Sequence, residues 1–348
     1  MSNIQIDTNI HMGCRTNEGN YVYNWYMVDM NSFKASHNKT IFMLGGNTTN
    51  CEEAANGNAK VVDRLISDKN RDRTTIYSMV YDDEPISSES GILTEKYREE
   101  AHDIFPKLIK PMLFDSVGNI KEKQGVERAL GNIVLVAHCG GSEFVNIIID
   151  DIYDCIAEHY HESIAKQLIG KIKYFAYAPC HLPNKPVTSF IITPFLDNNC
   201  SWTKVFDEVA DKKVYADYPR GAVKSLLKAR ERGELYEAFK KIYRSERMIA
   251  LRSEQSTYII PNRLNANLSV GDHSIDCLVK RSVIDADADC AKTARVMNTI
   301  SQLILNQFVS SRTIDQRDLF DEMTSIMKKN KPYTINSSDE PTSSVNET

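Results

Sequence analysis

The stretch that decides the fold is Asn132–Ser142, which reads NIVLVAHCGGS. Its first part is a continuous apolar run of strand length, which is typical of a strand buried on both faces of a sheet. Small residues follow His138, and apolar residues at helical spacing then continue from Ser142 to His159. The stretch therefore predicts a buried strand, a sharp turn at Cys139 and an amphipathic helix.

This strand–turn–helix plan has the physical features of a nucleophile elbow, in which a small residue stands two positions before and two positions after the nucleophile. Ala137 and Gly141 are those small residues, because so tight a turn brings neighbouring backbone too close for larger side chains. The N-terminal end of the following helix would stabilise an anion at Cys139 and lower the pKa of its thiol. The N–H of Gly140 is placed to bind an oxyanion. The alternative is a buried structural cysteine in an ordinary strand-to-helix turn.

Outward from this stretch, short apolar runs alternate with longer helical patterns, which predicts an α/β fold with a mostly parallel central sheet flanked by helices. The predicted strands are Tyr21–Met30, Thr40–Leu44, Thr75–Tyr81, Asn132–His138, Lys173–Ala178, Thr188–Pro194 and Thr257–Ile260. The predicted helices are Asn50–Ser67, Thr94–Leu113, Ser142–His159, Lys292–Val309 and Asp315–Lys328.

The chain divides into an N-terminal extension (1–20), one main domain (21–330) and a C-terminal tail (331–348). Within the domain, residues 201–255 are strongly charged and are predicted to form a helical insertion at the surface. Its mixed charges at helical spacing favour a solvated helix with surface ion pairs, and a lid over an anionic substrate is the alternative. The polar tail predicts disorder. It also resembles the C-terminal export signals of some bacterial effectors.

Composition excludes several classes of protein. The chain has 42 Lys and Arg against 47 Asp and Glu, a net charge of −5, so it lacks the basic field of a nucleic-acid-binding protein. It has no signal-peptide pattern and no apolar run that could span a membrane, which favours a cytoplasmic protein, with an exported effector as the alternative. The eight cysteines show no C-x-x-C pair and no metal-ligand spacing, so neither a zinc site nor a disulfide scaffold is expected. No nucleotide-binding motif occurs, no cofactor is predicted, and the sequence indicates no particular oligomeric state.

The segment Ala137–Gly141 (AHCGG) resembles the Gly-His-Ser-x-Gly elbow of the α/β-hydrolase superfamily, with Cys in the position of Ser, as in dienelactone-hydrolase-like members. The resemblance spans roughly residues 20–310, and the elbow is its only specific motif. Ala137 departs from the first Gly of the motif and Cys139 from its Ser. The resemblance implies a nucleophile at Cys139 and an α/β-hydrolase-like sheet.

Three further segments follow in the chain order that the resemblance implies. Ile41–Asn47 (IFMLGGN) looks like the strand and loop that supply a second oxyanion N–H, from Gly46 or Asn47. Ile191–Asp197 (IITPFLD) resembles the strand whose loop carries the acid, so Asp197 matches the acid position. The plainer interpretation of Gly45–Gly46 is a glycine turn before a helix, and that of Asp197 is a loop aspartate that caps the next segment.

The late loop Val270–Ser274 (VGDHS) resembles the Gly-x-His loop of the family, which makes His273 the candidate base. The implied order is nucleophile, acid, base, and the charged insertion would account for the 76 residues that separate His273 from Asp197. His138, inside the elbow, and His181, after a predicted strand, are competing histidines.

Together these residues predict a hydrolase or acyltransferase that attacks an ester, thioester or lactone carbonyl through Cys139. The expected partner is a small-molecule or acyl substrate. A second hypothesis belongs to another class: the fold serves as a non-catalytic binding or interaction scaffold, in which the cysteine has no chemical role.

Overall fold

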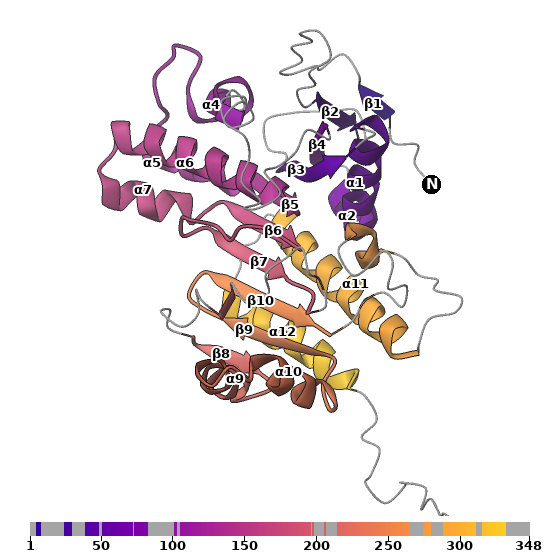
Figure 1. Cartoon of the computed structure of the whole chain (residues 1–348). Helices are drawn as coiled ribbons and strands as arrows, with labels where there is room; N and C mark the ends of the chain where they lie inside the picture. The colour runs from indigo at the N-terminus through magenta and orange to yellow at the C-terminus, as the bar shows by residue number, and fades with distance from the viewer. Residues whose placement is uncertain are drawn as a thin grey trace, which may run out of the picture.

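The computed structural model describes residues 5–7, 24–29, 39–48, 51–71, 73–82, 101–102, 105–195, 197, 205–206, 214–262, 264, 274–279, 288–310 and 315–331. Its strands form one ten-stranded sheet in the order β1-β2-β4-β3-β5-β6-β7-β10-β9-β8 (Figure 1). The strands are β1 (Gln5–Asp7), β2 (Asn24–Asp29), β3 (Lys39–Thr48), β4 (Thr74–Asp82), β5 (Ile133–His138), β6 (Lys173–Tyr177), β7 (Thr188–Ile192), β8 (Ala216–Tyr218), β9 (Met248–Arg252) and β10 (Ser256–Pro261).

The centre of the sheet is parallel and its two sides are antiparallel. Strands β4, β3, β5, β6, β7 and β10 pair in parallel, with β5 between β3 and β6. Antiparallel pairing adds β2 and β1 beyond β4, and β9 and β8 beyond β10. The mostly parallel sheet predicted from the apolar runs is confirmed, and each of the seven predicted strands is present.

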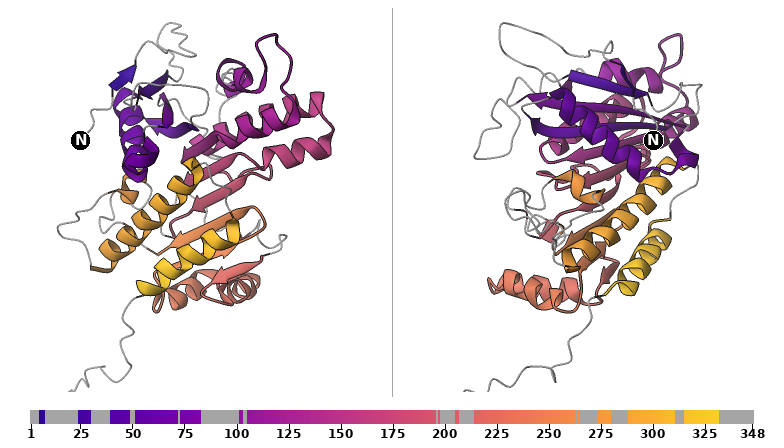
Figure 2. Two further views of the ribbon diagram at one scale, coloured as in Figure 1. Left: turned by 180° about the vertical axis from the view of Figure 1, so that it is seen from behind. Right: turned by 90° about the vertical axis from the view of Figure 1, so that its right-hand side faces the viewer.

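Helices cover both faces of this sheet (Figures 1 and 2). Helices α5, α6 and α7 share one hydrophobic cluster with the sheet, while α1, α11 and α12 share a second cluster on the opposite face. The helices are α1 (Cys51–Leu65), α2 (Asp68–Arg71), α4 (Lys110–Leu113), α5 (Lys123–Gly131), α6 (Gly141–His159), α7 (Glu162–Ile169), α9 (Ala222–Glu231), α10 (Leu235–Tyr243), α11 (Ala288–Val309) and α12 (Gln316–Lys329), with a π-helical turn at Phe105–Ile109 and a 3₁₀ turn at Ile275–Leu278.

Strand β5 shows why its sequence is apolar throughout. Ile133, Leu135 and Ala137 belong to the cluster under α5–α7, whereas Val134 and Val136 belong to the cluster under α1, α11 and α12. All five side chains are fully buried. Because successive side chains of a strand point to opposite faces, a strand covered on both faces needs an apolar residue at every position.

The predicted helical insertion 201–255 needs a correction. It contains helices α9 and α10, as its charged helical pattern indicated, but it also contains β8 and β9, which extend the sheet beyond β10. Strand β9 is short and apolar, and four of its five side chains are buried. The charged helices α9 and α10, which come directly before it in the chain, concealed this strand in the sequence pattern.

The ends of the chain also differ from the expectation. Strand β1 lies within the predicted extension 1–20 and pairs with β2. In the described part of the predicted helix Thr94–Leu113, a π-helical turn precedes the short α4. Lys331 is the only described residue of the predicted tail 331–348, and the rest of the tail lies outside the described residues. Among the helices of the described residues, none is both long and apolar enough to cross a membrane.

Candidate functional site at the carboxyl ends of the strands

The predicted elbow is a strained turn. Strand β5 ends at His138, α6 begins at Gly141, and Cys139 between them has a φ of 53°. This left-handed conformation costs an L-residue roughly 1–2 kcal/mol. Two hydrogen bonds fasten the turn, because the backbone N–H and the hydroxyl of Ser142 both donate to the Cys139 carbonyl, at 3.2 and 2.7 Å. A non-glycine residue is thus held in the sharp geometry that the sequence predicted for the nucleophile.

The two small positions have a steric cause. A methyl group on Gly141 would lie 2.1 Å from the carbonyl oxygen of Leu44, on the neighbouring strand β3. Ala137 is fully buried in the cluster beneath α6. Real Cβ atoms do not approach a carbonyl oxygen so closely, so position 141 requires glycine.

The structure brings three of the predicted residues together. A methyl group on Gly46 would lie 3.0 Å from Cβ of Cys139, 3.4 Å from its Sγ and 3.6 Å from the backbone nitrogen of Gly140. The Gly-Gly segment was predicted to be a loop, and this needs a correction: β3 continues to Thr48, with an irregularity in its pairing to β4 between Leu44 and Asn47. The glycines therefore form a bulged part of the strand beside the thiol.

Cys180 also lies at this site, although the sequence analysis gave it no role. Its Sγ is 3.8 Å from Sγ of Cys139, and its backbone N–H donates to the Cys139 carbonyl at 3.2 Å. It follows β6, the neighbour of β5, by three residues. Because carboxyl ends of parallel strands meet at one edge of a sheet, that position was the available signal.

The histidines take different places. The His181 N–H donates to Oγ of Ser142 at 3.0 Å, and its Nε2 lies 3.9 Å from a carboxylate oxygen of Glu143, a buried residue in the first turn of α6. The ring of His138 lies 6.1 Å from that of Tyr177. The predicted base His273 lies outside the described residues. His181 is therefore the described histidine that the structure fastens to the elbow.

Asp197 follows β7 and lies at the same edge of the sheet. It is 4% exposed, and its backbone N–H donates to the Pro194 carbonyl at 3.3 Å. Strand β6 separates β7 from β5, so the two strands lie about 10 Å apart. Asp197 therefore lies in the segment after the second strand from β5.

The described cysteines differ in exposure. Cys139 and Cys180 are partly exposed, while Cys155, Cys277 and Cys290 are buried, and none of these five forms a disulfide. Burial raises the pKa of the Cys155 thiol, which keeps it protonated. Among the described residues, no group of three or more His, Cys, Asp or Glu side chains could hold a metal ion.

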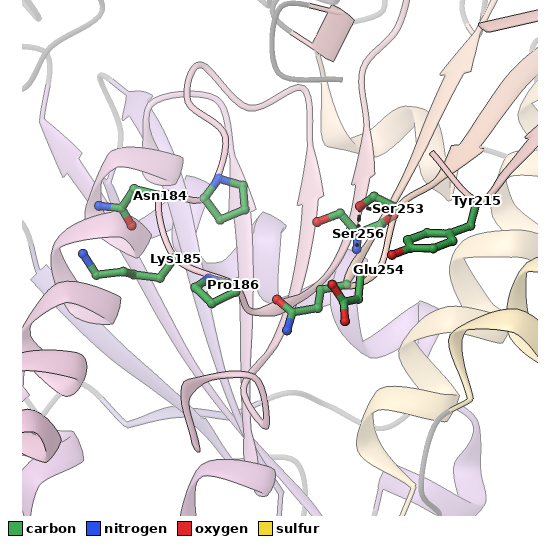
Figure 3. Close-up of a pocket in the computed structure, with 9 residues that line it drawn as sticks. Asn184, Lys185, Pro186, Tyr215, Ser253, Glu254 and Ser256 are labelled. Carbon is green, nitrogen blue, oxygen red and sulfur yellow. Dashed lines mark hydrogen bonds between the residues drawn. The ribbon is translucent and has the colours of Figure 1, made fainter. Parts of the chain in front are cut away.

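Two cavities of the described part lie away from this site. The first, of about 470 Å³, lies near the amino ends of β7 and β10, where Lys185, Tyr215 and Glu254 line it (Figure 3). The second, of about 750 Å³, lies beside α9 and β8. Neither cavity is lined by Cys139, Gly46 or Asp197. These two cavities therefore do not belong to the candidate site.

The sheet order and the helices on both faces define an α/β-hydrolase-like fold. Comparison of the sequence with protein-family models and with curated proteins finds no match. Among solved structures, an acetyl xylan esterase from Aspergillus awamori is similar at 9% sequence identity and a TM-score of 0.32, over 75% of this chain and 93% of that one. At those values the likeness carries no argument about chemistry, and the description of the fold rests on its topology.

Proposed function

We propose that this protein is a hydrolase or acyltransferase in which Cys139 attacks an ester, thioester or lactone carbonyl. The observation that carries the proposal is the turn itself: Cys139 has a φ of 53° and its thiol lies beside Gly46 and Gly140. Strained non-glycine residues persist where the surrounding structure holds them, and they cluster at active sites. A purely structural cysteine in this turn gains nothing from the left-handed conformation.

The position of the thiol supports its reactivity. Cys139 lies at the N-terminus of α6, a helix of 19 residues. The partial positive charge of a helix N-terminus favours the thiolate over the thiol. The thiolate is also a good leaving group, so the tetrahedral intermediate can expel it again and return to substrate. Esters, thioesters and lactones with a good leaving group of their own are therefore the favoured substrates.

The proposed reaction has two steps. His273 accepts the thiol proton, Sγ of Cys139 attacks the carbonyl carbon, and the N–H of Gly140 with that of Gly46 or Asn47 holds the oxyanion. The tetrahedral intermediate collapses, the imidazolium protonates the leaving group, and a thioester to Cys139 remains. Water, deprotonated by the same imidazole, then attacks the thioester and releases the acid, and the thiolate takes back the proton. Asp197 orients the imidazole and stabilises its protonated form.

The test compares the wild-type chain with Cys139→Ala on a panel of p-nitrophenyl esters, acyl thioesters and lactones. We expect turnover to fall by about 10³-fold or more in the variant, since loss of a nucleophile costs several orders of magnitude. Cys155→Ala, which changes a buried thiol on the same helix, is the matched control and should keep wild-type rates. Equal turnover in wild type and Cys139→Ala would remove Cys139 from the mechanism.

A thiol-directed probe separates the enzyme from a non-catalytic scaffold. Under the proposal, iodoacetamide at pH 7 alkylates Cys139 much faster than the buried Cys155, Cys277 and Cys290, as peptide mass spectrometry would show. Slow labelling of Cys139, together with no turnover on the whole panel, would favour a binding scaffold.

The base is assigned by a second pair of variants. His273→Ala should abolish turnover, whereas His181→Ala should keep both turnover and the acid limb of its pH–rate profile. The reverse result would move the role of base to His181, which the structure fastens to the elbow through Ser142. Asp197→Asn should lower kcat with little change in KM, because it removes the group that orients the imidazole.

A further inference from the structure

Two partly exposed thiols face each other at the candidate site. Sγ of Cys139 and Sγ of Cys180 are 3.8 Å apart, although the residues are 41 positions apart in the chain and follow different strands. Cys155, Cys277 and Cys290, the other cysteines whose side chains the structure describes, are buried. The proposed mechanism uses Cys139 alone, so Cys180 has no role in it.

The backbone of Cys180 is fixed to that of Cys139. The N–H of Cys180 donates to the Cys139 carbonyl at 3.2 Å, and the N–H of His181 donates to Oγ of Ser142, which itself donates to the same carbonyl. Ala178, two residues earlier, has a φ of 50°, so the segment that carries Cys180 also leaves its strand in a left-handed turn. These contacts hold the two thiols together through the backbone rather than through flexible side chains.

This geometry satisfies the requirements of a disulfide. The backbone hydrogen bond and the 3.8 Å between the sulfur atoms keep the two residues as close as a disulfide needs. The sulfur atoms need to approach to about 2.05 Å, which rotation of the two side chains can supply. Formation of the bond therefore requires no rearrangement of the elbow.

We propose that Cys139 and Cys180 form a reversible disulfide on reaction with hydrogen peroxide or another hydroperoxide, and that this disulfide inactivates the nucleophile. The inactivation rests on the proposed function, whereas the disulfide does not. The pair has both parts of a redox-sensitive site. The Cys139 thiolate at the helix N-terminus reacts with peroxide, and the Cys180 thiol that resolves the product is already beside it.

The reaction balances in two steps. The Cys139 thiolate attacks one oxygen of the hydroperoxide, the O–O bond breaks, and the departing oxygen takes a proton as water or an alcohol, which leaves a sulfenic acid on Cys139. The Cys180 thiolate then attacks that sulfur, the S–S bond forms, the S–O bond breaks, and the hydroxide leaves as water after taking a proton. Overall, two thiols are oxidised by two electrons and one hydroperoxide is reduced. A dithiol reductant reverses the change by thiol–disulfide exchange.

The experiment treats the full chain with hydrogen peroxide and maps its disulfides by mass spectrometry under non-reducing conditions. We expect a peptide pair linked through Cys139 and Cys180 in the wild type, and its loss after dithiothreitol. The control Cys155→Ala should form the same link. Oxidation of Cys139 without a link to Cys180, or linkage of Cys139 to another cysteine in its place, would overturn the proposal.

The variant Cys180→Ala keeps the test independent of catalysis. Without a resolving thiol, the sulfenic acid on Cys139 should proceed to the sulfinic acid, which dithiothreitol does not reduce. Recovery of the free Cys139 thiol should then be about tenfold lower than in the wild type. Equal recovery in both proteins would contradict a resolving role for Cys180.

Activity is measured in a separate arm. If the reduced wild type hydrolyses an ester of the panel, peroxide should abolish that turnover and dithiothreitol should restore it. A chain that forms the disulfide but hydrolyses nothing would contradict the proposed function and leave the modification site standing. A chain that is active but forms no link would contradict this inference alone.

Discussion

The two edges of the parallel sheet are built differently. At the edge where the strands end, Cys139 and Ala178 have left-handed backbone, and Gly141 packs against the carbonyl of Leu44. At the edge where the strands begin, the ammonium groups of Lys39 and Lys173 both donate to the Gly131 carbonyl at the end of α5, at 2.8 and 2.9 Å. The edge where the strands end therefore has strained and closely packed backbone. The edge where the strands begin has two lysine ammonium groups that share one carbonyl acceptor.

The difference shows where the fold accepts an unfavourable contribution to its stability. At the first edge the cost is conformational and is located at a reactive thiol, which is how active sites store strain. At the second edge the cost is electrostatic, since burial and the charge of Lys39 lower the pKa of Lys173 to about 7. Substitutions at the first edge should therefore alter packing and the reactivity of the thiol. Substitution of a lysine at the second edge should mainly alter how stability depends on pH.

The largest expected effect comes from Gly141→Ala. The added methyl group meets the Leu44 carbonyl oxygen, and the neighbouring backbone of β3 has to move to admit it. We expect the free energy of unfolding to fall by about 3 kcal/mol or more, measured by urea denaturation.

Gly131→Ala is the matched control at the opposite edge. A methyl group on Gly131 meets no atom within 4 Å. Because Gly131 is the last residue of α5, alanine there should be neutral or stabilising by about 0.5 kcal/mol. If the two substitutions cost the same, the close packing at the elbow is not what fixes glycine at position 141.

The second effect is on the pH dependence of stability. Because the folded-state pKa of Lys173 is about 7 and the unfolded value is near 10.5, the unfolded chain binds the extra proton between these pH values. The free energy of unfolding should then rise with pH from 7 to 9, by roughly 2 kcal/mol. Lys173→Met should remove most of that rise in urea denaturation at a series of pH values, since burial also lowers the pKa of Lys39 and leaves a smaller part.

Lys171→Met provides the control for this experiment. Lys171 is a neighbouring surface lysine, 43% exposed, whose ammonium lies 2.6 Å from a carboxylate oxygen of Glu127. Its removal leaves Lys173 and Lys39 in place, so the rise with pH should persist. A flat profile in the wild type would show that the two lysines are hydrated well enough to keep ordinary pKa values.

The fold could be predicted from the sequence where one physical rule governed a segment. The apolar runs of the central parallel strands record burial on two faces, so these six strands were identified. Strand β9 was missed because it is a short apolar run directly after two charged helices, and only its pairing with β10 makes it a strand. Strand β1 was missed since its three residues carry no pattern that local sequence could reveal.

The site divides in the same way. The strained turn at Cys139 and the close approach at Gly141 follow from local spacing, and the structure has both. The approach of Cys180 depends on which strand lies beside β5, so local sequence could not reveal it. The same holds for Glu143 and His181, because one lies in the first turn of α6 and the other in the segment that follows β6.

The third effect concerns the rate at which a reagent reaches the Cys139 thiol. In Gly46→Ala the methyl group would lie 3.4 Å from Sγ of Cys139 and crowd the path to it. We expect the rate of Cys139 alkylation by iodoacetamide to fall about tenfold, because small displacements near a reacting atom are costly. Gly57→Ala, which meets no atom within 4 Å in α1, should leave the rate unchanged. An unaltered rate in Gly46→Ala would place the approach to the thiol on another side.

The smallest effect tests the strain itself, through a comparison of glycine with alanine at two cysteine positions. Cys139 has a left-handed backbone, which glycine adopts without steric cost and alanine does not. Cys155 lies inside α6, where glycine destabilises a helix relative to alanine by about 1 kcal/mol. Cys139→Gly should therefore be more stable than Cys139→Ala by about 1 kcal/mol, while Cys155→Gly should be less stable than Cys155→Ala by a similar amount.

The glycine and alanine variants at each position are compared by urea denaturation of the reduced chain. The sign of the difference in their free energies of unfolding decides the result. Comparing glycine with alanine at one position cancels most of the lost cysteine packing, so what remains is the preference of the backbone. If alanine is the more stable residue at both positions, the turn at Cys139 is relaxed in solution. The strain that supports a nucleophile at this edge of the sheet would then be absent, and the two edges would differ only in charge.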